Sequence, residues 1–126
     1  MTDENIALIQ LARSFADRAK EAVILACKPD AHIGDWMPAM SHCHDNVARW
    51  VEHYPRHKHI FGCICQEIPF SKSVRLTPHS AVQDDDGDLF DITPNAWASW
   101  VWFIPHTGTR EEFAPLAQLR EIEMPL

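Results

Sequence analysis

A thiol stands between two imidazoles in the segment Ser41–Asn46, which reads SHCHDN. The thiolate is the reactive form of cysteine, and a helix N-terminus or a neighbouring imidazolium lowers a thiol pKa from about 8.5 toward roughly 3.5–7.5. Apolar residues at helical spacing, among them Val47 and Trp50, predict a helix that opens near Cys43. Its first-turn N–H groups could also bind an oxyanion. Cys43 is therefore the candidate nucleophile, and a buried, inert thiol is the alternative.

His79 and Asp91 lie on two strand-like segments, 73–83 and 88–93, that flank an acidic turn. A pairing centred on Asp85 places His79 directly opposite Asp91. Residues directly opposite share one face of a sheet, with Cβ atoms about 4.5–5.5 Å apart. At that separation a carboxylate can hold one ring nitrogen and leave the other for a thiol. A lone core histidine and an Asx-type turn at Asp91 are the alternatives.

This order of cysteine, histidine and aspartate, with the cysteine at a helix start, resembles the transglutaminase-like and papain-like cysteine enzymes. It is most similar to the transglutaminase-like branch, in which a short hairpin carries the histidine on one strand and the aspartate on the next, often as Asp-x-Thr. Residues 79–94 here read HSAVQDDDGDLFDITP. The resemblance covers roughly residues 36–94. It implies Cys43 as the nucleophile, His79 as the general base and Asp91 as the residue that orients the base.

Three further residues have supporting roles in this interpretation: Trp36, His44 and Asn46. The Asn46 amide would hold the active-site loop, and a solvent-facing helix position is its alternative. His44 would be an electrostatic or structural neighbour of the thiol, because adjacent helical residues do not face each other. The resemblance implies that Trp36 donates its indole N–H to an oxyanion. The chain departs from the family pattern at His42, where a glycine often stands, and at Ala81, where an aromatic residue is frequent.

A zinc site is the main competing hypothesis for the histidines and cysteines. His57 and His59 stand two residues apart, as do Cys63 and Cys65, so each pair lies on one face of a strand. Together the four side chains would satisfy tetrahedral zinc. Their spacing differs from the usual Cys-x-x-Cys knuckle, and the segment also fits a plain buried strand. The thiol mechanism needs no cofactor, and zinc is the alternative cofactor.

The segments along the chain predict a single α+β domain over residues 1–126. Residues 1–28 form a long amphipathic scaffold helix in this prediction, and residues 36–94 form the catalytic core. Residues 95–126 add a strand and a C-terminal helix that opens at Thr109 with the capping-box pattern Thr-Arg-Glu-Glu. The expected fold is thus α+β, with the N-terminal helix and the cysteine-bearing helix packed on a small antiparallel β-sheet. The resemblance implies a papain-like or transglutaminase-like core.

The net charge of −7 argues against a nucleic-acid partner and against an anionic membrane surface, because both repel an acidic protein. No apolar run reaches the ~18 residues of a membrane span. The start MTDENIALIQ lacks the basic and then apolar pattern of a signal peptide. We therefore expect a cytoplasmic protein whose four cysteines are reduced thiols. The Trp-rich segment 97–103 is typical of a core or an interface, and a homodimer is one way to cover the faces of its strand.

These observations predict a cysteine-dependent acyl transferase, or an amide or ester hydrolase, with a small-molecule or peptide acyl substrate. The thiolate would attack a carbonyl, the first-turn N–H groups would hold the oxyanion, and His79 would protonate the leaving group. The alternative is a non-catalytic metal-binding or protein-interaction module that uses the His/Cys cluster. A structural domain with a vestigial site is the third interpretation.

Overall fold

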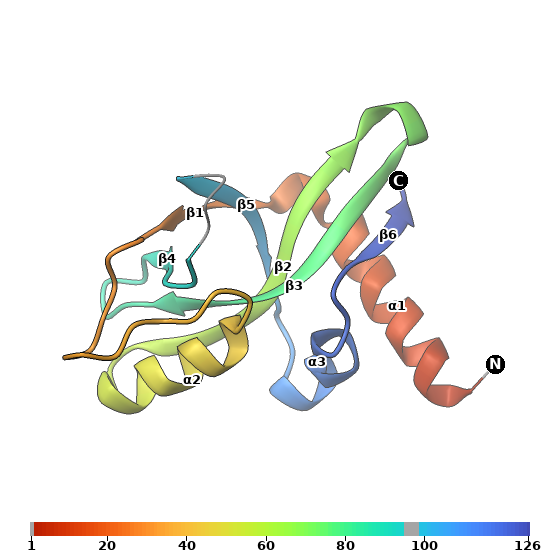
Figure 1. The fold of residues 1–126 in the computed structure, drawn as a ribbon. Coiled ribbons are helices and arrows are strands. Elements are labelled where there is room, and N and C mark those ends of the chain that lie inside the picture. Colours follow the sequence, from red (N-terminus) through yellow and green to blue (C-terminus); the bar gives the residue numbers. More distant parts are fainter. Residues whose placement is uncertain (1, 95–98) are drawn as a thin grey trace. The chain divides into compact units, whose positions relative to one another are not determined.

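The computed structural model describes residues 2–94 and 99–126, so Trp97 and Ala98 of the predicted aromatic strand lie outside the described residues. Figure 1 shows the helices and strands of the chain. In order they are α1 (Asp3–Asp17), the 3-10 turn η1 (Ala19–Glu21), β1 (Val23–Cys27), α2 (Cys43–His53), β2 (Lys58–Ile68), the 3-10 turn η2 (Pro69–Ser71), β3 (Ser73–Gln83), β4 (Leu89–Asp91), β5 (Trp100–Pro105), α3 (Arg110–Ala117) and β6 (Ile122–Pro125).

The strands form one sheet in the order β2-β5-β1-β4-β3-β6, and β2 also pairs with β3. These pairings close five strands into a β-barrel and leave β6 added to β3. The sheet is mixed, because β1 pairs with β4 in parallel, whereas β5 with β2, and β4 and β6 with β3, pair antiparallel. The predicted fold, helices on a small antiparallel sheet with a papain-like or transglutaminase-like core, is therefore wrong.

The predicted scaffold helix over residues 1–28 is also wrong beyond its first four turns. Helix α1 ends at Asp17, where the N–H of Arg18 donates to the carbonyls of Phe15 and Ala16. The segment Val23–Cys27 is strand β1. Its β-branched side chains suit a strand, and a short apolar run cannot be assigned to helix or strand from its periodicity alone.

The two later helices begin where the sequence predicts. Helix α2 starts at Cys43 with His42 as its N-cap residue, and it buries Val47 and Trp50 as expected. Helix α3 follows a capping box, in which the Thr109 hydroxyl accepts from the N–H of Glu112 and the Glu112 carboxylate accepts from the N–H of Thr109. Strand β6, which follows α3, is absent from the predicted layout of residues 95–126.

The β3–β4 hairpin has a different register from the predicted one. Val82 lies opposite Phe90 and Gln83 lies opposite Leu89, so the pairing brings Asp91 opposite Ala81 rather than His79. The turn is closed by the Asp84 carboxylate, whose Oδ1 accepts from the N–H groups of Asp86 and Asp88 at 3.0 Å each. Gly87 completes the turn with a φ of 87°, a conformation that glycine adopts without strain.

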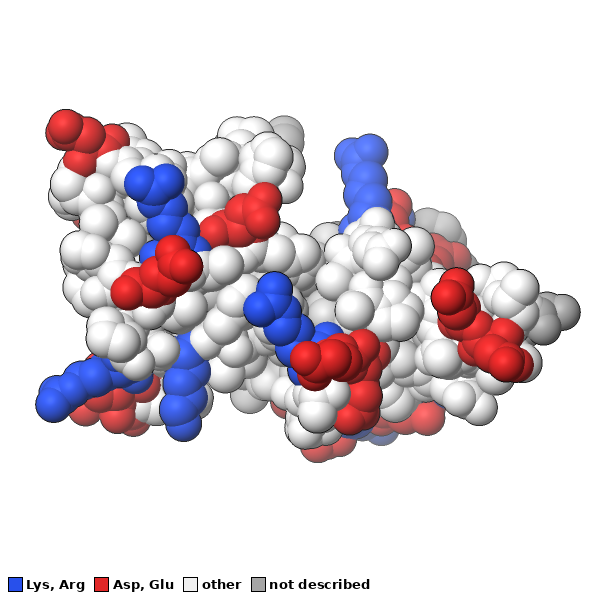
Figure 2. All heavy atoms as spheres, turned by 90° about the horizontal axis from the view of Figure 1, so that it is seen from below, with Lys and Arg blue, Asp and Glu red and all other residues white. Residues whose placement is uncertain are grey.

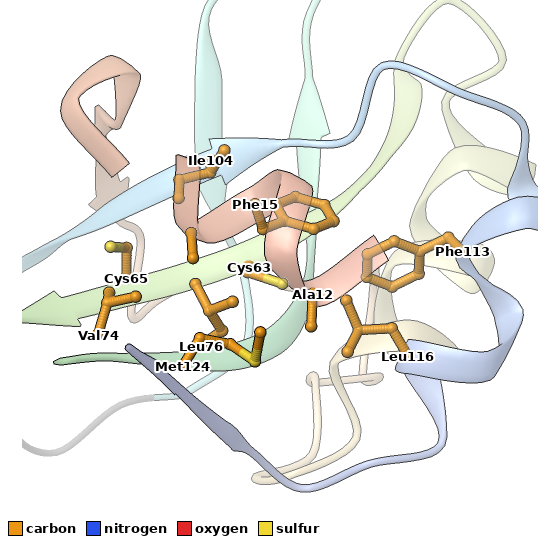
Figure 3. Packing of buried hydrophobic residues seen from close by; sticks show 11 residues of the cluster. Ala12, Phe15, Cys63, Cys65, Val74, Leu76, Ile104, Phe113, Leu116 and Met124 are labelled. Atoms are coloured by element: carbon orange, nitrogen blue, oxygen red, sulfur yellow. The ribbon is translucent and has the colours of Figure 1, made fainter. Parts of the chain in front are cut away.

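The chain divides into two compact units, and it passes from one to the other within β1, β2, β3 and β5. The first unit comprises Met1–Val23, Phe61–His79 and Trp102–Leu126. Its core is almost entirely apolar, with α1 packed against α3 and β6. Figure 3 shows the side chains of this core, namely Ala12, Phe15, Cys63, Cys65, Val74, Leu76, Ile104, Phe113, Leu116 and Met124.

The second unit comprises Ile24–Ile60 and Ser80–Val101. Its smaller apolar cluster joins α2 to β3 and β4 through Val47, Trp50, Val82, Phe90 and Ile92. Polar side chains are buried beside this cluster, namely Asn46, Ser80, Asp91 and Thr93. Such groups persist inside a protein only when they are hydrogen-bonded.

Charged side chains of both signs are interspersed on the molecular face drawn in Figure 2. Within residues 2–94 and 99–126, no helix has the length and apolar character needed to cross a membrane.

Candidate functional site

Cys43 is the first residue of α2 and is partly exposed. The N-cap residue, His42, contributes no side-chain cap, and the first intrahelical bond runs from the N–H of Asn46 to the His42 carbonyl at 2.9 Å. The N–H groups ahead of Asn46 have no intrahelical acceptor, and the helix dipole places partial positive charge there. Helix N-termini are among the positions at which thiol pKa values are lowered.

Asn46 fixes the loop that leads into Cys43. Its amide Nδ2 donates to the Ala39 carbonyl at 2.8 Å, and its Oδ1 accepts from the Ala39 N–H at 3.0 Å. The same Nδ2 donates to the Thr93 hydroxyl at 3.0 Å. Asn46 is only 3% exposed, so the solvent-facing alternative for this residue does not apply. The backbone on both sides of Cys43 is thereby held to the segment that follows β4.

Asp91 continues this network on the other side of Thr93. Its Oδ1 accepts from the Thr93 N–H at 3.0 Å, which is the Asx-type turn considered from the sequence, and its Oδ2 accepts from the Cys27 thiol at 3.9 Å. Burial, and then the Asp91 charge and hydrogen bond, raise the pKa of the Cys27 thiol. Asp91 is 2% exposed. Cys27 was missed in the sequence because it was assigned to a helix rather than to β1, where it pairs with Asp91.

His79 belongs to the first unit, whereas Cys43 and Asp91 belong to the second. Its side chain is 7% exposed, and its ring meets the Phe103 ring edge-on with the ring centroids 6.4 Å apart, a separation typical of aromatic pairs. The assignment of His79 as general base stays a prediction from sequence order. The predicted cross-strand pairing of His79 with Asp91 is wrong, because the observed register brings Ala81 opposite Asp91.

Two histidines of the second unit meet at one hydroxyl that sequence reasoning did not single out. His44 Nδ1 lies 2.6 Å from the Ser80 Oγ, and His59 Nε2 lies 2.7 Å from the same oxygen. Ser80 is fully buried. Nothing in the local pattern around Ser80 marks it, because the contact joins α2, β2 and β3 over long sequence separations.

Trp36, the predicted oxyanion donor, lies in a short loop closed by backbone hydrogen bonds in both directions between Ile33 and Trp36, each 2.9 Å. Its ring packs against the apolar cluster of the second unit. The Arg49 guanidinium lies 5.0 Å from the ring centroid, a cation–π arrangement. Its role toward an oxyanion stays a prediction.

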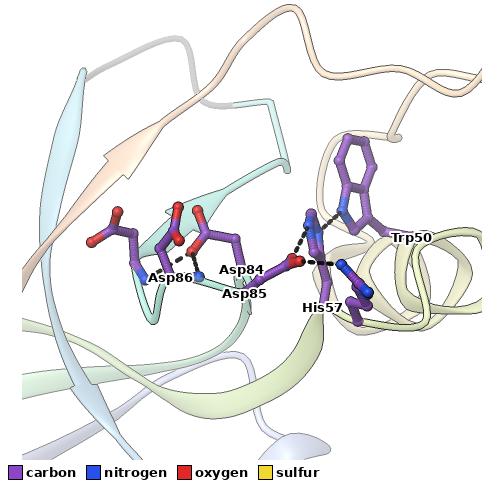
Figure 4. A network of polar contacts seen from close by, with 7 residues as sticks. Trp50, His57, Asp84, Asp85 and Asp86 are labelled. Atoms are coloured by element: carbon purple, nitrogen blue, oxygen red, sulfur yellow. Dashed lines mark hydrogen bonds and ion pairs between the residues drawn. The ribbon is translucent and has the colours of Figure 1, made fainter.

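The four residues of the alternative zinc site have other partners. The Trp50 indole donates to His57 Nδ1 at 3.0 Å, and His57 Nε2 lies 3.4 Å from an Asp85 oxygen (Figure 4). His57 therefore uses both ring nitrogens, and its Nδ1 is unprotonated. His59 bonds to Ser80.

Cys63 and Cys65 are buried in the apolar core of the first unit, and burial raises the pKa of both thiols. A raised pKa disfavours the thiolate that zinc requires. Carboxylates gather elsewhere, at Asp84, Asp86 and Asp88. Exposed acidic groups commonly gather in this way without an ion, and the hydrogen bonds of the turn account for their placement.

Comparisons of the chain with protein-family models, with curated proteins and with solved structures find no match. What the protein does must therefore be inferred from its own side chains.

Proposed function

We propose that the protein is a cysteine-dependent acyl transferase or amide or ester hydrolase with Cys43 as its nucleophile. The contrast among the four thiols carries the proposal. Burial raises the pKa of Cys27, Cys63 and Cys65. Cys27 and Cys43 are both partly exposed, but Cys27 ends a strand, whereas Cys43 lies at the first turn of a helix. Cys43 is thus the one of the four cysteines that is both partly exposed and at a helix N-terminus, a position that favours a thiolate.

The buried network around Asn46 supports this role. Catalytic groups need a fixed geometry, because misplacement by about 1 Å costs large factors in rate. The two bonds from Asn46 to Ala39 and the bond to Thr93 hold the backbone on both sides of the thiol. Burial of an amide costs free energy that its hydrogen bonds must offset. We take the use of such a group here as support for a role that depends on the position of this loop.

The reaction proceeds by attack of the Cys43 thiolate on the carbonyl carbon of a small-molecule or peptide substrate. Negative charge develops on the carbonyl oxygen, where the first-turn N–H groups of α2 stabilise it. The leaving amine or alcohol departs with a proton from a general acid. Water or an acceptor amine then attacks the thioester, gives up a proton to the same group, and regenerates the thiol.

Alkylation of the four cysteines, followed peptide by peptide across pH, tests the nucleophile. Cys43 should react first, with a midpoint below about 8.5, while Cys27, Cys63 and Cys65 serve as internal controls. The His79→Ala variant should raise that midpoint if His79 is the base. A Cys43 that reacts as slowly as Cys63 would end the proposal.

Turnover tests the reaction itself. A panel of thioesters, activated esters and glutamine amides should be consumed by the wild type and left intact by Cys43→Ala. The matched control is Cys27→Ala, which removes a thiol of the same unit and should keep the activity. Zinc analysis of the purified protein tests the alternative module, and stoichiometric zinc bound through His57 or His59 would favour it.

A further inference from the structure

A buried hydroxyl joins two imidazoles in the second unit. Ser80 of β3 is 0% exposed, and its Oγ lies 2.6 Å from His44 Nδ1 and 2.7 Å from His59 Nε2. Both separations are those of good hydrogen bonds. Both rings are partly buried, and one of them follows Cys43 directly in α2.

The two hydrogen bonds of the Ser80 hydroxyl must differ in direction. Serine carries a single hydroxyl proton, so Ser80 can donate to only one of the two rings and must accept from the other. If Ser80 donates to His44 Nδ1, then His59 Nε2 carries a proton and donates to Ser80. If the direction reverses, His44 Nδ1 carries the proton and His59 Nε2 does not. The tautomers of the two rings are therefore coupled.

We propose that His44, Ser80 and His59 form a proton relay, one end of which, His44, follows Cys43 in α2. A proton that arrives at His59 Nδ1 allows the Nε2 proton of that ring to pass to the Ser80 oxygen. The Ser80 hydroxyl proton passes at the same time to His44 Nδ1, and the proton on His44 Nε2 leaves. One proton enters, one leaves, and the hydroxyl is regenerated; the reverse transfer restores the first tautomers.

The relay gives Cys43 chemistry a path for protons that the nucleophile alone lacks. Thiolate formation releases a proton and leaving-group departure consumes one, and Ser80 links a ring at the helix start to a ring on β2. A single hydrogen bond from Ser80 would be enough to hold the His44 ring in place, whereas the Ser80 oxygen bonds to both the His44 and the His59 ring. This assignment of a role at Cys43 rests on the proposed function; the coupling of the two rings does not.

Nitrogen-15 spectra of the histidine rings in the full-length protein test the coupling. In the wild type, one of the two facing nitrogens, His44 Nδ1 and His59 Nε2, should be protonated and the other unprotonated. The Ser80→Ala variant should change the tautomer balance of both rings, and Ser80→Thr, which keeps a hydroxyl, should restore it. Two protonated facing nitrogens, or rings unaffected by Ser80→Ala, would overturn the relay.

Ser73→Ala is the matched control, because it removes another buried hydroxyl from β3, one that is bonded to Ser71 at 2.7 Å. It should leave both ring spectra unchanged. If Ser80→Ala fails to fold, the wild-type spectrum and Ser80→Thr still decide whether the facing nitrogens differ in protonation.

Kinetics separate the relay from the proposed function. Ser80→Ala should lower turnover by about tenfold or more, within the range of general acid–base effects, while Cys43 is still alkylated. Ser80→Thr should recover most of the loss. If the two rings are coupled but Cys43 is unreactive, the proposed function is wrong and the coupling of the rings still holds. A reactive Cys43 whose turnover is indifferent to Ser80→Ala would remove the relay and keep the nucleophile.

Discussion

The first unit buries apolar side chains from α1, α3 and four strands, among them Phe15, Phe103 and Phe113. The second unit has a smaller apolar cluster and buries Asn46, Ser80, Asp91 and Thr93 beside it. Apolar burial is non-directional and tolerates small rearrangements. A buried polar network stabilises one geometry only, because each group that loses its partner becomes costly.

The cysteines follow the same division. Cys63 and Cys65 fill the core of the first unit as small apolar groups. In the second unit, Cys27 donates to Asp91 and Cys43 opens α2. The cysteines of the first unit are therefore buried core residues, whereas both cysteines of the second unit are partly exposed.

Phe113→Ala should give the largest effect, a loss of about 3–5 kcal/mol in the free energy of unfolding. Phe113 is 0% exposed, and its ring lies between those of Phe15 and Phe61. Urea denaturation measures the loss. Phe70→Ala is the matched control, because Phe70 is 94% exposed in the same unit and should change stability by less than about 0.5 kcal/mol. Equal losses would contradict the packing of this core.

Asn46→Ala should cost about 1–3 kcal/mol, since one buried and two partly buried hydrogen bonds are lost. The same variant should slow Cys43 alkylation, which links the network to the thiol. Asn5→Ala, at an exposed position of α1, should stay within about 0.5 kcal/mol. If Asn46→Ala lowers the free energy of unfolding no more than Asn5→Ala does, the hydrogen bonds of Asn46 do not stabilise the fold.

Alkaline pH should destabilise the protein through Cys63. Burial raises the pKa of this thiol in the folded state, so above about pH 8.5 the unfolded chain loses a proton that the folded chain keeps. Its contribution to stability is complete below that pH and declines by about 1.4 kcal/mol per pH unit above it. Denaturation of Cys63→Ala between pH 7 and 10 should show a shallower decline than the wild type. Parallel curves would exclude Cys63 as a source.

Asp91→Asn should give the smallest effect, a several-fold faster alkylation of Cys27 at pH 8. After burial, the Asp91 charge and hydrogen bond are the causes that raise the Cys27 pKa, and the amide removes that charge while it still accepts from Thr93. Asp88→Asn, in the exposed turn, is the control and should leave the rate unchanged. An unaltered Cys27 rate in Asp91→Asn would show that burial alone protects this thiol.

Several elements were predictable because their signals are local. Strand β3 spans the predicted residues 73–83, and the caps of α2 and α3 lie at His42 and Thr109. The errors come from choices that local patterns leave open. Val23–Cys27 fits either helix or strand until a neighbouring strand pairs with it. The β3–β4 register differs by two residues from the one centred on Asp85, and the acidic run Asp84–Asp86 allows either turn.

The sequence by itself determined that Cys43 opens a helix, because the signals for this, an apolar stripe and the residues that precede it, lie within one or two helical turns of each other. Only the tertiary structure decided that five strands close into a barrel, that Cys27 meets Asp91, and that Ser80 joins His44 to His59. Each of these contacts joins segments far apart in the chain. Strand pairing sets them, and a shift in register would redirect the side chains to other partners or to the opposite face.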